Sequence, residues 1–190
     1  MYKRQPYDDA PAAEVRPTPD STTIETLVDQ ANKLYPRSDR PWEASDTLKN
    51  VVVVADYPDG HKEVLVIGVP GNREVDMKRL EASLSPADVR MAEAKDLEAY
   101  PDLVPGYIGP QVIGPNSPKR TTDEDGNPVG SPRYLIDPRI VPGTRWVTGA
   151  NQAGMHVFNL VCGRDFTADG TIEAAEVLDC LLYTSPSPRD

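Results

Sequence analysis

The pattern of apolar and polar positions is clearest in NVVVVADYPDGHKEVLVIGV, residues 50–69. Two runs of β-branched residues flank a turn that contains Asp59 and Gly60. An Asp-Gly pair between two such runs is typical of a tight β-hairpin. Residues 50–69 therefore predict two antiparallel strands, with His61 exposed to solvent in the turn.

Helical spacing appears first in STTIETLVDQANKLY, residues 21–35. Its apolar positions recur every three or four residues, at Ile24, Leu27, Val28 and Ala31. Ser21 or Thr22 is expected to cap the helix, because Glu25 stands three residues after Thr22, which is the spacing of a capping box. Residues 70–84 predict a turn that leads into a second helix, with Leu80 and Leu84 on its apolar face.

Shorter segments complete the pattern. We expect residues 6–20, rich in Pro, Ala and acidic residues, to be an extended linker, and residues 47–50 to end a short helix. A strand is expected at 89–94, a short helix at 95–103, a glycine-rich loop running into a strand at 104–114 and a polar surface excursion at 116–133. Further strands are expected at 134–137, 145–150 and 155–162. This irregular alternation favours an α+β fold with a mixed β-sheet over a doubly wound parallel sheet.

Composition narrows the function classes. The chain has 190 residues, about the size of one domain, and a formal charge of −10. Most proteins that bind nucleic acid unaided are basic, so a nucleic-acid substrate would need a second source of affinity. We find no apolar run long enough to span a bilayer and no signal peptide, and we expect a cytoplasmic protein without membrane contact. No Cys or His cluster has the spacing of a zinc site, so no metal is expected.

Both ends of the chain have an unusual sequence. MYKRQ and CLLYTSPSPRD are translations of one transposon-derived sequencing adapter read in opposite directions. We therefore expect residues 1–5 and 180–190 to be adapter-encoded and the rest to be an internal piece of a longer gene. Without them the charge becomes −12, since Lys3 and Arg4 are removed and Arg189 and Asp190 cancel. Cys162 would then have no partner for an internal disulfide.

Four stretches combine turn residues with polar groups that could carry chemistry. They are EVDMKRL with Lys78, PGYIGP with Gly106 to Pro110, LIDPRI with Asp137, and GANQAGMH with His156. Each alone is weak evidence, because a lysine on a helix is usually solvated and an Asp before Pro usually forms a turn. A histidine beside a strand is more often packed than catalytic, although its ordinary pKa suits either role.

Taken in order, these stretches resemble the insertion (editing) domain of bacterial prolyl-tRNA synthetase, related to the YbaK-type deacylases. The likeness covers about residues 20–178, and the domain is expected at 21–179. TIETLV with TLKNVVV resembles the opening helix and first strand, and GANQAGMHVFNLVCGRD is the most specific match. The resemblance implies a mixed sheet or partly closed barrel with surrounding helices.

The resemblance also implies an activity, hydrolysis of alanine mistakenly attached to proline tRNA, and a role for each residue. Lys78, or Arg79 beside it, would hold the terminal nucleotide or polarise the ester. The loop of Gly106, Tyr107, Ile108, Gly109 and Pro110 would admit the aminoacyl group and offer N–H groups to the oxyanion. Asp137 would receive the amino group of alanine, with Gly149, Ala150 and Asn151 as further substrate contacts. His156 would bound the alanine pocket, with an acid/base role as the less favoured alternative.

The partners follow from the same resemblance. Motifs for proline activation are absent from this chain, so ATP and Mg²⁺ would act only in the rest of a parent synthetase, expected to be a homodimer, and editing itself would need no cofactor. Two alternatives stay open: a free-standing deacylase of the YbaK type, and a catalytically silent insertion that only stabilises the synthetase.

Overall fold

The structure is a computed structural model that describes residues 9–177. The two segments predicted to be adapter-encoded, residues 1–5 and 180–190, lie outside the described residues. None of the helices within 9–177 is long and apolar enough to cross a membrane.

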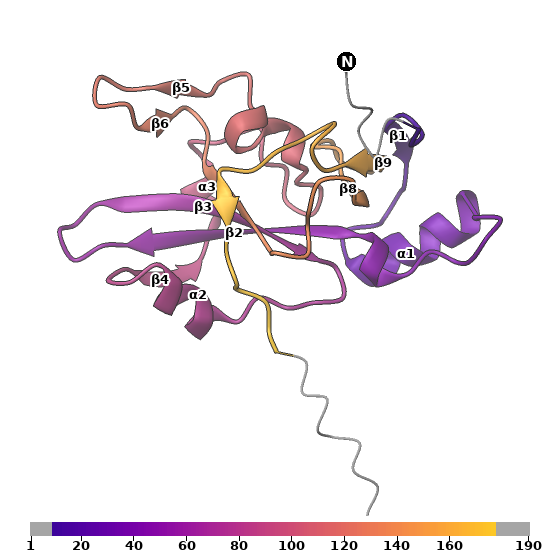
Figure 1. The fold of residues 1–190 in the computed structure, drawn as a ribbon, viewed down its shortest axis with the longest axis horizontal. Helices are drawn as coiled ribbons and strands as arrows, with labels where there is room; N and C mark the ends of the chain where they lie inside the picture. The colour runs from indigo at the N-terminus through magenta and orange to yellow at the C-terminus, as the bar shows by residue number, and fades with distance from the viewer. Residues whose placement is uncertain (1–8, 178–190) are drawn as a thin grey trace, which may run out of the picture.

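Five strands form the larger sheet, in the order β10-β7-β3-β2-β4 (Figure 1). Their bounds are Leu48–Asp56 for β2, Lys62–Pro70 for β3, Asp88–Met91 for β4, Arg133–Ile136 for β7 and Gly170–Thr171 for β10. β2 and β3 pair along their full length as the predicted hairpin, and His61 is exposed in its turn. β3 is antiparallel to β2 but parallel to β7, so the sheet is mixed, as predicted.

Three strands form the smaller sheet, in the order β1-β9-β8. They are β1 (Glu14–Pro17), β8 (Arg145–Gly149) and β9 (Met155–Val161). An isolated parallel bridge between Thr47 and Val147 joins this sheet to the larger one. The linker prediction for 6–20 was therefore wrong for residues 14–17. These residues have no apolar periodicity, and they become a strand only because the open edge of β9 supplies hydrogen-bond partners.

The described helices are short. They are α1 (Ile24–Leu34), α2 (Met77–Ser83) and α3 (Ala94–Leu97). Both predicted longer helices are confirmed, but the cap of α1 is Thr23, not Ser21 or Thr22. Thr23 accepts from the backbone of Thr26, whose hydroxyl in turn accepts from the backbone of Thr23. A threonine thus completes the reciprocal cap that Glu25 was expected to form.

Two predictions of local structure were wrong. Residues 48–50 belong to β2, because pairing with the end of β3 extends the strand toward its N-terminus; the helical turn ends earlier, at Ala44–Asp46. The segment after Gly106 forms two 3₁₀ turns, Pro110–Val112 and Gly114–Asn116, and no strand. Proline has no N–H to donate to a sheet, and Pro110 and Pro115 interrupt any ladder there.

The polar excursion holds only the small exposed hairpin of β5 (Thr121–Thr122) and β6 (Pro128–Val129).

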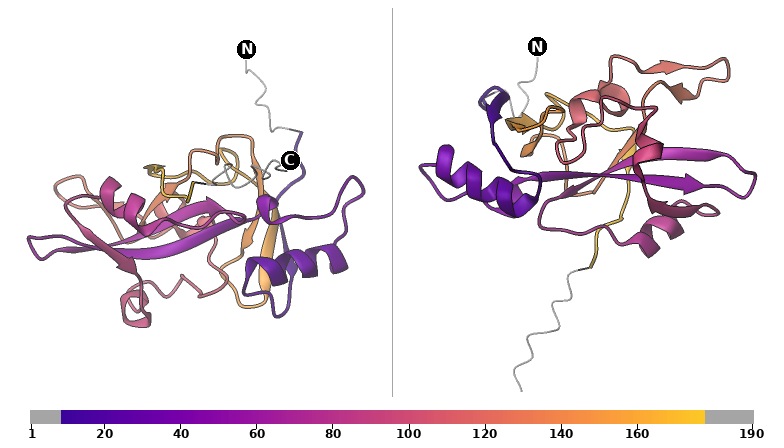
Figure 2. Two further views of the ribbon diagram at one scale, coloured as in Figure 1. Left: turned by 90° about the horizontal axis from the view of Figure 1, so that it is seen from below. Right: turned by 180° about the vertical axis from the view of Figure 1, so that it is seen from behind.

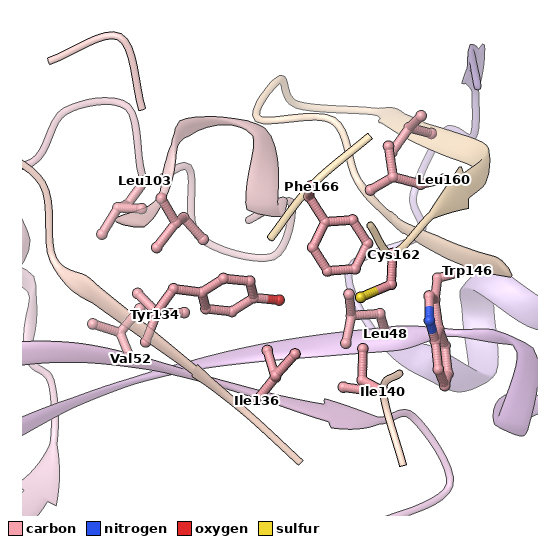
Figure 3. Packing of buried hydrophobic residues seen from close by; sticks show 13 residues of the cluster. Leu48, Val52, Leu103, Tyr134, Ile136, Ile140, Trp146, Leu160, Cys162 and Phe166 are labelled. Carbon is pink, nitrogen blue, oxygen red and sulfur yellow. The ribbon is translucent and has the colours of Figure 1, made fainter. Parts of the chain in front are cut away.

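The larger sheet is buried on both faces, and different elements cover each face. On one face α2 and the segment that follows β10 pack over Val53, Leu65 and Ile67. On the other face the loop segment 103–113 and the smaller sheet enclose a core around Tyr134 (Figure 3). A third cluster joins α1 to the smaller sheet through Leu27, Ala31, Val147 and Phe158, and Figure 2 shows α1 lying beside these strands.

Candidate functional site

A cleft of about 360 Å³ opens where the two sheets meet α1. Its walls are the start of α1, the start of β2, the loop around Gly106, the end of β8 and the start of β9. We call it the His156 cleft, after one of the residues that line it. Of the residues predicted from sequence, Gly106, Ile108, Gly149 and His156 line it. Segments spread between Ser21 and His156 thus form one site.

Backbone-to-backbone packing builds one wall. A Cβ on Gly109 would overlap the carbonyl oxygen of Gly149, and a Cβ on Gly149 would overlap the backbone of Tyr107. Asn151, with a φ of 60°, ties the two segments together. Its N–H donates to the carbonyl of Tyr107 at 2.8 Å, and its side-chain oxygen accepts from the N–H of Gly109 at 2.8 Å. The Gly-Ala-Asn and Gly-x-x-x-Pro motifs are therefore the two halves of one structural unit.

This packing decides which N–H groups of the loop are available. The N–H of Tyr107 donates to the carbonyl of Val104, and that of Gly109 is used by Asn151. Within the described part of the chain, the N–H groups of Gly106 and Ile108 donate to no protein atom. Both residues line the cleft. They are therefore the donors that the loop can offer to a bound oxygen.

Asn50 holds the loop from the side of the larger sheet. Its amide nitrogen donates to the carbonyl of Ile108 at 3.0 Å and to the hydroxyl of Thr148 at 3.1 Å. Its oxygen accepts from the hydroxyl of Tyr134 at 2.7 Å. Figure 3 shows Tyr134 in the core between Val52 and Leu48, with its hydroxyl directed along the sheet. Every polar group of this network is satisfied, so the position of Ile108 is fixed by β2, β7 and β8 together.

His156 is buried, with 4% of its surface exposed. Burial lowers its pKa from the ordinary 6.5 to about 4, so the imidazole is neutral at pH 7. Nδ1 bonds the hydroxyl of Thr18, which is fully buried, and the ring lies 5.4 Å from that of Tyr107. Thr18 directly follows β1, so the strand missed in the sequence orients this histidine. A neutral, oriented ring is better suited to shaping a pocket than to carrying a charge.

Lys49, the second residue of β2, supplies the positive charge of the cleft. Its side chain is 21% exposed, and its ammonium lies 2.8 Å from a carboxylate oxygen of Glu74. Both residues line the cleft, and Glu74 is the one carboxylate among its lining residues. Sequence reasoning did not single out Lys49. The available signal was a lysine two residues before the β-branched run that begins at Val51, near the start of a strand.

Three predicted site residues lie elsewhere. Lys78 is exposed on α2, where it lines a shallow hollow with Glu81 and Pro86. Arg79 and Asp137 line a third hollow, the Asp137 cleft, on the face of the larger sheet that α2 covers. The structure therefore does not bring Lys78, Arg79 or Asp137 into the His156 cleft. Lys78 lies on the exposed face of α2, whereas the start of β2 brings Lys49 into the cleft.

The remaining predicted residues lie next to the cleft and hold the segments that form its walls. Pro110 is buried at the start of a 3₁₀ turn, and its carbonyl accepts from the side chain of Asn116. Ala150 packs against the core that surrounds Tyr134. Tyr107, Gly109 and Asn151 hold the loop, as described above. Pro110, Ala150 and these three residues do not line the cleft itself.

The cleft offers a defined set of chemical groups: one ammonium, one carboxylate, a neutral imidazole and two N–H donors. The N-terminus of α1, at Thr23 and Ile24, also lines it and adds a partial positive charge. Within residues 9–177 no three His, Cys, Asp or Glu side chains are grouped as a metal site requires. This set suits the binding of an ester or acyl group whose oxygen gains negative charge.

Proteins of similar sequence align with nearly the whole length of this chain. A proline–tRNA ligase of Kineococcus radiotolerans is 56% identical over 172 residues, which cover 90% of this chain and 28% of that protein. One of Nocardioides sp. is 54% identical over 186 residues, covering 97% of this chain and 29% of that protein. The chain thus spans less than a third of the length of these relatives.

Solved structures share the fold. A putative trans-editing enzyme for prolyl tRNA synthetase matches with a TM-score of 0.50 at 12% identity, over 76% of this chain and 74% of that one. The hypothetical protein APE2540 matches with a TM-score of 0.56 at 14% identity, over 87% and 92% of the two chains. These likenesses agree with the predicted α+β fold. The family model of the aminoacyl-tRNA editing domain matches residues 18–166. This chain therefore belongs to the aminoacyl-tRNA editing domain family, as its sequence motifs predicted.

Proposed function

We propose that this chain is the editing domain of a proline–tRNA ligase and hydrolyses the ester that links alanine, wrongly attached, to proline tRNA. The observation that carries the proposal is the His156 cleft. Lys49, the free N–H groups of Gly106 and Ile108, and a neutral His156 converge there in the fold of the aminoacyl-tRNA editing domain family. The similarity to proline–tRNA ligases indicates which tRNA is involved.

The need for such a site follows from the size of alanine. Alanine is smaller than proline, so a synthetic site shaped for proline rejects it by only about 1–3 kcal/mol. A second pocket that admits alanine and excludes proline supplies the missing discrimination. The buried ring of His156, held by Thr18, is proposed to set the size limit of that pocket.

The proposed reaction is attack of water on the ester carbonyl. The carbon–oxygen bond to water forms, the carbonyl oxygen becomes an oxyanion, and the bond to the ribose oxygen then breaks. The products are alanine and a tRNA whose ribose hydroxyl has regained a proton. The N–H groups of Gly106 and Ile108, two residues that line the cleft, are proposed to donate to the oxyanion, and the neighbouring hydroxyl of the terminal ribose is proposed to help position the water.

Charges of the cleft are proposed to hold the two ends of the substrate. Lys49 binds the terminal nucleotide or polarises the ester, the role first assigned to Lys78. Glu74 receives the amino group of alanine, the role first assigned to Asp137, because it is the one carboxylate lining the cleft. The reaction requires no cofactor, and the rest of the synthetase is proposed to supply most of the affinity for tRNA to this acidic chain.

The test is a deacylation assay with proline tRNA charged with alanine or with proline. The wild-type chain should release alanine at least about tenfold faster than proline, in line with exclusion of the larger side chain. His156→Ala should narrow that ratio by releasing more proline, while His61→Ala, in the exposed hairpin turn, should leave it unchanged. A folded chain that releases neither amino acid, alone or within a whole synthetase, would refute the proposal.

A further inference from the structure

A larger cleft, of about 630 Å³, lies at the other end of α1. Tyr35 after α1, the loop 36–46, β1, β8 and β9 form its walls. Four arginines line it, Arg16, Arg37, Arg40 and Arg145, and we call it the arginine cleft. Only two carboxylates, Asp39 and Asp46, stand among its lining residues. A local excess of positive charge in a chain of formal charge −10 is a feature that the proposed hydrolysis does not use.

The arginines differ in how firmly they are already paired. Arg37 pairs with Asp39, and Arg40 pairs with Asp46 through two hydrogen bonds. Among the residues that the structure describes, Arg16 forms an ion pair only with Glu14, whose side chain is 61% exposed. Arg145 is exposed and, among residues 9–177, its side chain makes no hydrogen bond or ion pair. Arg145 and Arg16 therefore offer planar guanidinium groups that can bind phosphate oxygens in pairs.

Aromatic rings alternate with these arginines. The guanidinium of Arg37 lies 4.9 Å from the ring centre of Trp42, and that of Arg16 lies 5.0 Å from the ring centre of Tyr35. Rings and guanidinium planes side by side, in a positive groove, are the features with which proteins bind single-stranded nucleic acid. An acidic peptide would use the charges but would leave this alternation unexplained.

The arginine cleft is placed to continue the His156 cleft. In the register of β1 and β9, Arg16 stands opposite His156. Its guanidinium lies 4.9 Å from the ring centre of Phe158, two residues further along β9. The two clefts flank the two ends of α1, an 11-residue helix about 16 Å long at 1.5 Å per residue. At about 3.4 Å per stacked nucleotide, four or five nucleotides cover that distance, and fewer do so when the strand is extended.

We propose that the arginine cleft binds the backbone phosphates of the single-stranded RNA that precedes the aminoacylated terminal nucleotide. The inference rests on the proposed function, because it places the terminal nucleotide in the His156 cleft. The RNA chain then runs past Arg16 and along the smaller sheet to Arg145. This cleft gives an acidic domain a local basic surface for its polyanionic substrate.

The first experiment measures binding without catalysis. A fluorescent, uncharged single-stranded RNA with the 3′ sequence of proline tRNA is titrated with the full chain at two or more salt concentrations. Arg145→Gln should weaken binding about five- to tenfold and lower the slope of log affinity against log salt by about 1, as expected for one lost phosphate contact. Arg145→Lys should recover much of the affinity. Arg73→Gln removes the same charge on the other face of the larger sheet and should bind as the wild type does.

The second experiment separates this inference from the proposed function. Deacylation is compared for alanine-charged proline tRNA and for the alanyl ester of adenosine, which has no upstream phosphates. Arg145→Gln should raise KM for the tRNA with little change in kcat and should leave hydrolysis of alanyl-adenosine unaltered. If wild type hydrolyses both substrates and Arg145→Gln binds RNA and cleaves both equally well, the arginine cleft has no RNA role although the function stands. If wild type hydrolyses neither substrate, the function fails, and the RNA titration still decides the cleft.

Discussion

The His156 cleft and the Asp137 cleft have nearly the same volume, about 360 and 350 Å³. They differ in whether the polar groups that line them already have protein partners. In the Asp137 cleft both charged residues that the sequence proposed for the site, Asp137 and Arg79, have protein partners. Asp137, 1% exposed, accepts from the backbone and guanidinium of Arg139, and Arg79 donates to the carbonyl of Ala175 at 2.7 Å. In the His156 cleft Lys49 and Glu74 also pair with each other, but within the described residues the N–H groups of Gly106 and Ile108 donate to no protein atom, and the imidazole is neutral. The His156 cleft is thus distinguished by two backbone donors without a partner, which a bound oxygen can satisfy.

The largest difference between the two regions is expected when Lys49 and Lys78 are each replaced by alanine. Lys49→Ala should lower kcat/KM for deacylation of alanine-charged proline tRNA by about 100-fold or more, the scale on which loss of one electrostatic contact to a reacting oxygen acts. Lys78→Ala, on the exposed side of α2, should change it less than about twofold. Steady-state deacylation of both folded variants tests this. The reverse order of effects would restore the assignment made from sequence and place the chemistry outside the His156 cleft.

The wall shared by the loop and β8 can be broken with one methyl group. Gly109→Ala places a Cβ on the carbonyl oxygen of Gly149, and neither backbone can yield without losing the bonds of Asn151. The expected cost is about 3 kcal/mol in the free energy of unfolding, with loss of deacylation. Gly170→Ala is the matched control, because its Cβ would meet only Leu135 at an ordinary 3.4 Å. Urea denaturation measures both; equal stability would show that the loop does not need this close approach.

The pH dependence of the free energy of unfolding tests whether His156 is neutral in the folded chain. Its pKa is about 4 in the folded chain against the ordinary 6.5, so between these values the unfolded chain binds more protons. The stabilisation is complete above pH 6.5 and is lost as the pH falls toward 4. Between pH 7 and 4.5 the wild type should lose about 2 kcal/mol more unfolding free energy than His156→Gln. Denaturant titrations across this range decide it, with His61→Gln as the exposed control. Parallel curves for wild type and His156→Gln would mean that His156 is not held neutral.

The smallest effect is expected from the Asp137 cleft. Asp137→Asn keeps the shape of the side chain but removes the charge that faces Arg139, and should cost about 1 kcal/mol of unfolding free energy. Deacylation by the folded variant should stay within about twofold of wild type. A drop of tenfold or more in kcat/KM at unchanged stability would show that Asp137 acts on the substrate and that the two clefts are not separate in function.

Much of the fold could be predicted from the sequence because many of its elements depend on local patterns of residues. The hairpin of β2 and β3, with its Asp59-Gly60 turn, and the amphipathic α1 follow from period and turn chemistry within the segment itself. β1 did not, because Glu14 to Pro17 carry no apolar alternation and pair only through the free edge of β9. The strand expected after Gly106 is absent because Pro110 and Pro115 interrupt it, and the path of this loop is set by contact with Gly149, about 40 residues away in the chain.

The sequence by itself determined the family, the α+β class and the identity of His156 and the Gly106 loop as parts of a site, because motifs record residue types in a fixed order. It assigned the positive charge to Lys78, or Arg79, and the carboxylate to Asp137, and none of these residues lines the cleft. Only the tertiary structure brings Lys49 and Glu74 into the cleft and places Lys78 and Asp137 on the other face of the larger sheet. The physical reason is that motif order constrains neighbours along the chain, whereas the face on which a side chain lies depends on strand pairing between distant segments.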